Sequence, residues 1–96
     1  MGNKMNENNF SFELDNRGKS FCLRIARDMM NLFNISMPEA IGRINKQWKG
    51  LKIIGENLVY HRGSEEWAKI IYYEDGTFWW VKEWMDENEP KPKPYP

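Results

Sequence analysis

Long apolar segments are absent from this sequence of 96 residues. Its longest uninterrupted apolar runs, at 70–73 and 78–81, contain four residues each, whereas a helix that crosses a membrane needs about 20. The first nine residues also lack the apolar segment of a secretory signal. We therefore expect one small cytoplasmic domain that does not bind a membrane.

Cysteine and histidine occur once each, as Cys22 and His61. One cysteine cannot form an internal disulfide, and one histidine excludes a multi-histidine metal site. Cys22 falls on the apolar side of a helical pattern, so we expect a buried thiol and not a nucleophile paired with His61. Glu65, Glu66 and Asp75 fit a helix start and a turn better than a pair of catalytic carboxylates. With no glycine-rich phosphate loop either, we expect no enzyme activity, no metal and no cofactor.

Two segments in the first half show helical periodicity. From Ser20 onward, apolar residues recur along one stripe, and neither glycine nor proline interrupts residues 19–37. A second helix is predicted to begin at Ser36, because Ser36 and Glu39 have capping-box spacing, and to stop near Gly50. Only two residues lie between the segments, which predicts an antiparallel helix pair.

The second half favours short strands. Runs at 51–54, 58–61, 70–73 and 77–81 are β-prone, as is the alternating segment 10–14. Ser64 opens one predicted helical turn, and Asp75-Gly76 predicts a hairpin over residues 70–81. The expected fold class is α+β, two antiparallel helices packed on a small antiparallel sheet in the order β-α-α-β-(short α)-β-β. We expect an N-terminal tail (1–8), one domain (9–85) and an acidic, then proline-rich tail (86–96).

The net charge of zero conceals two oppositely charged halves. Residues 17–52 have a net charge of +6, and residues 56–89 have a net charge of −6. This split is compatible with mutual attraction of two solvated faces, or with a dipolar surface that steers a charged partner.

Aromatic residues concentrate between positions 60 and 84, where eight occur in 25 positions. Neighbouring residues of a strand point to opposite faces, so Trp79 and Trp80 cannot both enter the core. Part of this set must therefore face solvent, a partner or the proline-rich tail.

Several short patterns resemble a group of small uncharacterised bacterial proteins. They comprise Glu66-Trp67-Ala68 with Ile71-Tyr72-Tyr73, then Trp79-Trp80, and finally the segment 92–96, Pro-Lys-Pro-Tyr-Pro. The segment 39–49 is similar as well. The resemblance implies a bacterial or phage origin, and no activity or catalytic residue accompanies it.

Two functions fit these patterns. The first is a non-catalytic protein–protein interaction module, of the immunity or antitoxin kind, that binds a protein or peptide through the aromatic and acidic face of the sheet. The residues assigned to that face are Tyr72, Tyr73, Trp79, Trp80, Trp84, Glu65 and Glu74.

The alternative is a helix-turn-helix protein that binds nucleic acid through the basic side of the second helix. Its contact residues would be Arg43, Lys46, Gln47 and Lys49, with the 70–81 hairpin as a wing. The acidic tip of that wing, Glu74 and Asp75, argues against this function because phosphates would repel it.

Overall fold

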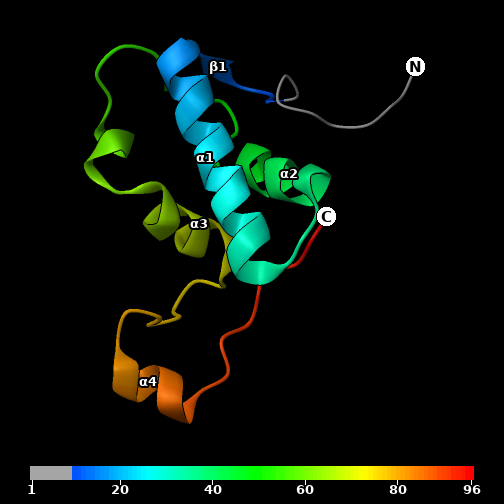
Figure 1. The fold of residues 1–96 in the computed structure, drawn as a ribbon, viewed down its shortest axis with the longest axis vertical. Coiled ribbons are helices and arrows are strands. Elements are labelled where there is room, and N and C mark those ends of the chain that lie inside the picture. The colour runs from blue at the N-terminus through cyan, green and yellow to red at the C-terminus, as the bar shows by residue number, and fades with distance from the viewer. Residues whose placement is uncertain (1–9) are drawn as a thin grey trace.

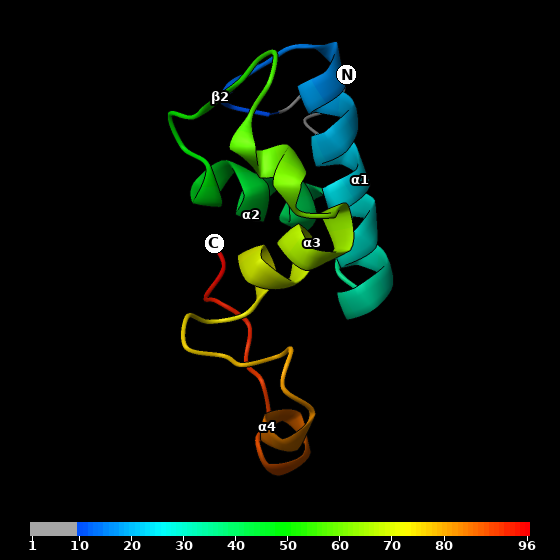
Figure 2. The same cartoon turned by 90° about the vertical axis from the view of Figure 1, so that its left-hand side faces the viewer.

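Three packed helices form the body of the protein (Figure 1). A computed structural model describes residues 10–96, so the tail predicted for residues 1–8 lies outside the described residues. Helix α1 (Asn16–Phe33) packs against both α2 (Met37–Gln47) and α3 (Ser64–Tyr72), and α2 also contacts α3. A fourth helix, α4 (Lys82–Glu87), lies apart from these three (Figures 1 and 2).

The core of this body is mainly aliphatic. Helix α1 buries Cys22, Ile25, Ala26 and Met29, which follow one another at helical spacing. The other buried hydrophobic residues come from α2, the following segment and α3: Ala40, Ile41, Ile44, Trp48, Ile53, Val59, Ala68 and Ile71. Burying one such aliphatic side chain stabilises the fold by about 1.5–3 kcal/mol.

Local capping explains where α1 and α2 begin. The Ser36 hydroxyl accepts a hydrogen bond from the Glu39 amide at 3.2 Å, which confirms the predicted start of α2. Helix α1 begins earlier than predicted, because Asp15 acts as its N-cap and accepts from the Gly18 amide at 2.8 Å. Residues 16–19, which precede the predicted start at Ser20, therefore belong to the helix. Helix α1 ends at Phe33, and its C-cap, Asn34, has a left-handed φ of 55°.

The predicted antiparallel sheet is wrong. The structure instead pairs two short strands in parallel, β1 (Glu13–Leu14) and β2 (Lys52–Ile53), with Glu13 opposite Lys52. A Cβ at Gly18 would lie 2.7 Å from the Ile53 carbonyl oxygen, so the close approach of α1 to β2 requires glycine.

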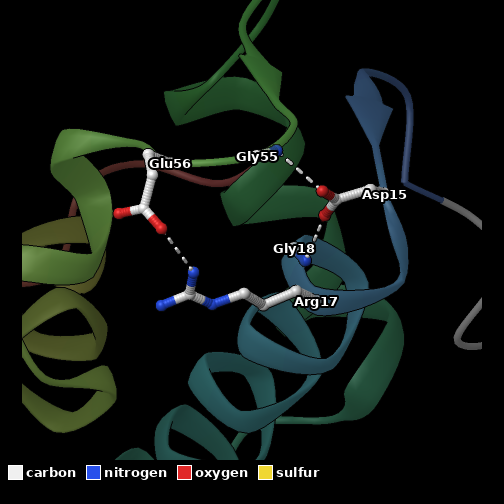
Figure 3. A network of polar contacts seen from close by, with 5 residues as sticks. All are labelled: Asp15, Arg17, Gly18, Gly55 and Glu56. Carbon is white, nitrogen blue, oxygen red and sulfur yellow. Dashed lines mark hydrogen bonds and ion pairs between the residues drawn. The ribbon is translucent and has the colours of Figure 1, made fainter.

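Asp15 joins this strand pair to the helix (Figure 3). One carboxylate oxygen accepts from Gly18 and the other accepts from the Gly55 amide at 2.7 Å, beyond the end of β2. These two backbone hydrogen bonds lower the pKa of Asp15 below its usual value. The hydrogen bond from Gly55 has the larger effect.

The predicted 70–81 hairpin is also wrong, since α3 extends through Tyr72. Ala68 and Ile71 are buried on the body side of α3, so packing against α1 overrides the β preference of Ile70 and Ile71. Gly76, with a φ of 85°, does form a turn, but no paired strands flank it. Residues 58–61, also expected as a strand, form the 3₁₀ helix η1 (Leu58–His61).

The C-terminal segment returns to the body beside the end of α3. The Glu74 amide donates to the Lys91 carbonyl at 2.9 Å, and the Lys93 amide donates to the Tyr72 carbonyl at 2.7 Å. We call residues 72–74 and 91–93 the neck, and residues 75–90 the arm. The arm, which contains α4, projects beyond the three packed helices (Figure 2). Among the described helices, none has both the length and the apolar character required to span a bilayer.

Candidate partner-binding arm

Four aromatic side chains of the arm pack on one another at its surface. Phe78 meets Trp80 edge-on with ring centroids 5.6 Å apart, and it meets Trp84 in the same way at 6.0 Å. Trp79 and Trp80 are also edge to face, 5.3 Å apart. Trp80 is 63% exposed and Phe78 is 46% exposed. Of the arm's side chains in the described structure, none reaches the buried core.

A groove separates the arm from α3. It encloses about 620 Å³ and is lined by Arg62, Glu66, Ile70, Trp79 and Trp80. On its α3 side, the Arg62 guanidinium lies 2.9 Å from the Glu66 carboxylate. The ammonium group of Lys69 lies 5.3 Å from the centre of the Trp79 ring, a distance that permits a cation–π interaction. The groove therefore has one indole-rich wall and one polar wall.

Acidic side chains dominate the charge of the arm. Residues 75–90 contain five acidic side chains and one basic side chain, a net charge of −4. The one base, Lys82, pairs with Asp86 at 3.0 Å on the exposed surface of α4. An acidic surface with exposed indoles attracts cations, both through space and at the ring faces.

Lys93 and Arg43 fix the neck against the body. The Lys93 ammonium donates to the Ile70 carbonyl at 2.9 Å and to the Gln47 side-chain oxygen at 3.0 Å. The Arg43 guanidinium donates to the Lys93 carbonyl and to the Glu39 carboxylate, both at 2.8 Å. Burial lowers the pKa of Lys93; nearby Asp75, at 3.9 Å, acts in the opposite direction. These contacts attach the returning end of the arm to α2 and α3.

The structure brings together only part of the aromatic and acidic set predicted from sequence. Trp79, Trp80 and Trp84 lie together in the arm, as described above. Tyr72 and Tyr73 contact Phe33 of α1, with centroid separations of 3.8 Å and 5.2 Å. Of the two, Tyr73 also lines a small cavity with Trp79 and Trp80. Both tyrosines are half-buried, and burial raises the pKa of Tyr73.

The two predicted acidic residues are placed differently. Glu74, at the neck, lines a small cavity together with Trp79 and Trp80. Glu65 lies in the first turn of α3 and does not line that cavity. The sheet face on which all seven residues were expected to meet does not exist, because residues 64–72 are helical.

The four residues predicted for DNA binding differ in their exposure to solvent. Arg43 is only 7% exposed and is engaged by Glu39 and Lys93, so its guanidinium is not available to a DNA groove. Lys46, Gln47 and Lys49 are exposed. Arg43, Lys46 and Gln47 line a cavity of about 610 Å³ together with the carboxylates of Glu74 and Asp75, while Lys49 is not part of its lining. Those carboxylates oppose the approach of a phosphate.

Sequence reasoning missed the residues that position the arm. The aromatic pattern gives Phe78 no role of its own, and the proline-rich pattern places Lys93 in a tail. Gly42 of α2 was missed too, although a Cβ there would overlap the Tyr95 hydroxyl, which shows how closely the tail approaches α2. The ion pair between Glu39 and Arg43 is predictable from the sequence, because oppositely charged residues four apart on a helix are neighbours.

No protein-family model, no curated protein and no solved structure shows significant similarity to this chain. The function must therefore be argued from the geometry described above.

Proposed function

We propose that this protein is a non-catalytic cytoplasmic binding module that captures a partner protein through its arm. The observation on which the proposal rests is the exposure of Trp80, 63%, within a cluster of four aromatic side chains. Tryptophan is enriched among the residues that dominate protein–protein binding energy, and clustered exposed aromatics mark interaction surfaces.

The charge of the arm specifies the chemistry of the partner. With a net charge of −4, the arm favours a partner segment rich in lysine or arginine. Such a segment would place its aliphatic stems in the groove between α3 and the arm, and its cationic groups over the Trp79 and Trp80 rings. An immunity-type inhibitor of a basic toxin would use a surface of this kind.

The neck supports this proposal by reducing the entropy lost on binding. Two backbone hydrogen bonds and the Lys93 and Arg43 contacts hold both ends of the arm in place before a partner arrives. A surface that is already ordered loses less conformational freedom when it binds.

Trp80→Ala tests the proposal against the matched control Leu58→Ala. Leu58 is also a large exposed hydrophobic side chain, 77% exposed, but it belongs to η1 and not to the arm. Partners would be captured by crosslinking the full-length protein in cells and then purified for calorimetry. We expect Trp80→Ala to weaken binding about 30-fold, the effect of losing a dominant interface residue, and Leu58→Ala to leave it within about twofold. Equal affinities for all three proteins, or a partner with an acidic contact surface, would contradict the proposal.

A further inference from the structure

A second cavity, separate from the arm, lies where α1, η1 and the start of α3 meet. It encloses about 430 Å³, within the range of small-molecule sites. Its lining consists of Arg17, Ser20, Phe21, Arg24, Tyr60, His61, Arg62, Gly63 and Ser64. Three of these residues are arginines, and none of the lining residues is acidic. We call it the arginine cavity.

The three arginines are weakly engaged by the rest of the fold. Arg17 lies 3.4 Å from Glu56 (Figure 3), whose own side chain is 97% exposed. Arg62 pairs with Glu66 at 2.9 Å, and both side chains are about half exposed. Within the described part of the chain, no side-chain hydrogen bond or ion pair engages Arg24. Because exposed ion pairs contribute only about 0–1 kcal/mol, an anionic ligand can compete for these guanidinium groups.

Several carboxylates interact with residues of the arginine cavity from outside it. Besides Glu56 and Glu66, two carboxylates interact with lining residues. Asp28 accepts a hydrogen bond from the Ser64 hydroxyl at 2.5 Å, and Asp15 acts electrostatically on Arg17 and Tyr60. None of these four carboxylates lines the cavity. The lining itself is thus cationic, although its surroundings are mixed.

Two further features of the wall suit an anion that bears a ring. Phe21 and Tyr60 meet edge to face with centroids 5.1 Å apart, and the Arg17 guanidinium lies 3.9 Å above the Tyr60 ring. The N-cap of α3, Gly63, has no side chain that could accept from the amides of the first turn. Because Gly63 and Ser64 both line the cavity, the positive end of α3 lies beside the arginines.

We propose that the arginine cavity binds the phosphate group of a small soluble phosphate monoester. Planar guanidinium groups bind phosphate oxygens in pairs, which a compact ammonium group cannot do. Of the residues that line the arginine cavity, only Arg62 also lines the groove beside the arm.

Arg24→Ala is the most direct test, and Arg27→Ala is its matched control. Both residues are exposed arginines of α1, and Arg27 does not line the cavity. The full-length protein would be titrated with adenosine monophosphate, and separately with adenosine, at constant ionic strength while amide NMR signals are recorded. We expect the monophosphate to shift the signals of Arg24 and residues 60–64. Arg24→Ala should weaken binding about fivefold, an effect of the size measured for exposed charge pairs, and Arg27→Ala should not change it.

Each other outcome overturns the proposal. Equal weakening by Arg24→Ala and Arg27→Ala would mean that only the general positive charge of α1 attracts the ligand. Adenosine binding as tightly as the monophosphate would mean that the phosphate is not recognised. A monophosphate titration that shifts none of these signals at concentrations up to about 20 mM, well above millimolar affinity, would exclude the site. Arg24→Glu provides a second variant, which should abolish binding if the cavity acts as proposed.

Discussion

The body and the arm of this protein use apolar side chains in opposite ways. The body buries aliphatic residues, and five of its seven largest fully buried side chains are isoleucines. The arm has four aromatic side chains, which pack on one another at the surface, and two of them are exposed. Apolar content alone therefore does not locate the core.

The residues that stabilise the fold therefore differ from the residues that we propose bind a partner. Substitutions in the body change the packing of α1, α2 and α3, whereas substitutions in the arm change a surface that the three helices do not need. The predictions below test this separation, beginning with the largest expected effect.

Shortening one core side chain should show the contrast between body and arm most clearly. Ile41→Ala removes a fully buried side chain of α2 and should lower the free energy of unfolding by about 2–5 kcal/mol. Phe78→Ala, in the arm, should change it by less than about 0.5 kcal/mol. Urea unfolding followed by far-UV circular dichroism measures both. Similar losses in the two variants would show that the arm is part of the core.

The neck should show an intermediate effect. Lys93→Met keeps the aliphatic stem but removes the donors to Ile70 and Gln47. We expect it to lower the free energy of unfolding by about 1–2 kcal/mol and to speed exchange of the Glu74 amide hydrogen.

Lys91→Met is the matched control for the neck, because Lys91 is exposed there and pairs through its backbone carbonyl. It should leave both the stability and the amide exchange unchanged. If Lys93→Met behaves like Lys91→Met, the side chain of Lys93 does not hold the arm.

High pH should destabilise the body through Cys22. Burial raises the pKa of this thiol from 9.0 to about 12. Between those values the unfolded chain has released the thiol proton while the folded chain retains it, so stability falls as pH rises. From pH 9 to 10 the expected loss is about 1 kcal/mol. Urea unfolding at both pH values measures it, and Cys22→Ala should abolish this part of the pH dependence.

Other groups affect stability in neighbouring pH ranges. The raised pKa values of Tyr60 and Tyr73 act in the same direction, mainly above pH 10, and the lowered pKa of Lys93 acts in the opposite direction. The comparison of wild type with Cys22→Ala removes these contributions. An unchanged pH dependence in Cys22→Ala would contradict the assignment to the thiol.

The smallest effect is expected on the surface of α4. Lys82 and Asp86 are four residues apart, and both are largely exposed. A double-mutant cycle with Lys82→Ala and Asp86→Ala should give a coupling energy of about 0.3–0.5 kcal/mol. A coupling above about 1 kcal/mol would indicate that α4 is more firmly packed than its exposure suggests.

The sequence predicted features that depend on neighbours in the chain. The start of α2 follows from Ser36 and Glu39, which lie within one turn, and the stripe containing Ile25 and Met29 follows from helical spacing. The turn at Gly76 is also local. These features require no knowledge of the rest of the fold.

Features that depend on distant residues were not predicted. The Ile70 and Ile71 pair favours a strand locally, but α3 is a helix because it packs against α1. The parallel pairing of β1 with β2 joins residues 39 positions apart, and Lys93 contacts residues 23 and 46 positions away. The sequence predicted that Trp79 and Trp80 could not both enter the core, and Trp80 is exposed. The reason given was wrong, since both belong to a projecting arm and not to a strand.

The neck also bears on how this protein can change over evolutionary time. Because the chain leaves the body at Glu74 and returns at Lys91 with those residues paired through their backbones, the segment between them could be shortened, lengthened or exchanged without moving α1, α2 or α3. Loop length itself changes the entropy of closure only slowly. The same helical scaffold could thus present unrelated recognition segments at this position, and a graft of a foreign binding loop between residues 74 and 91 would be a practical use of that tolerance.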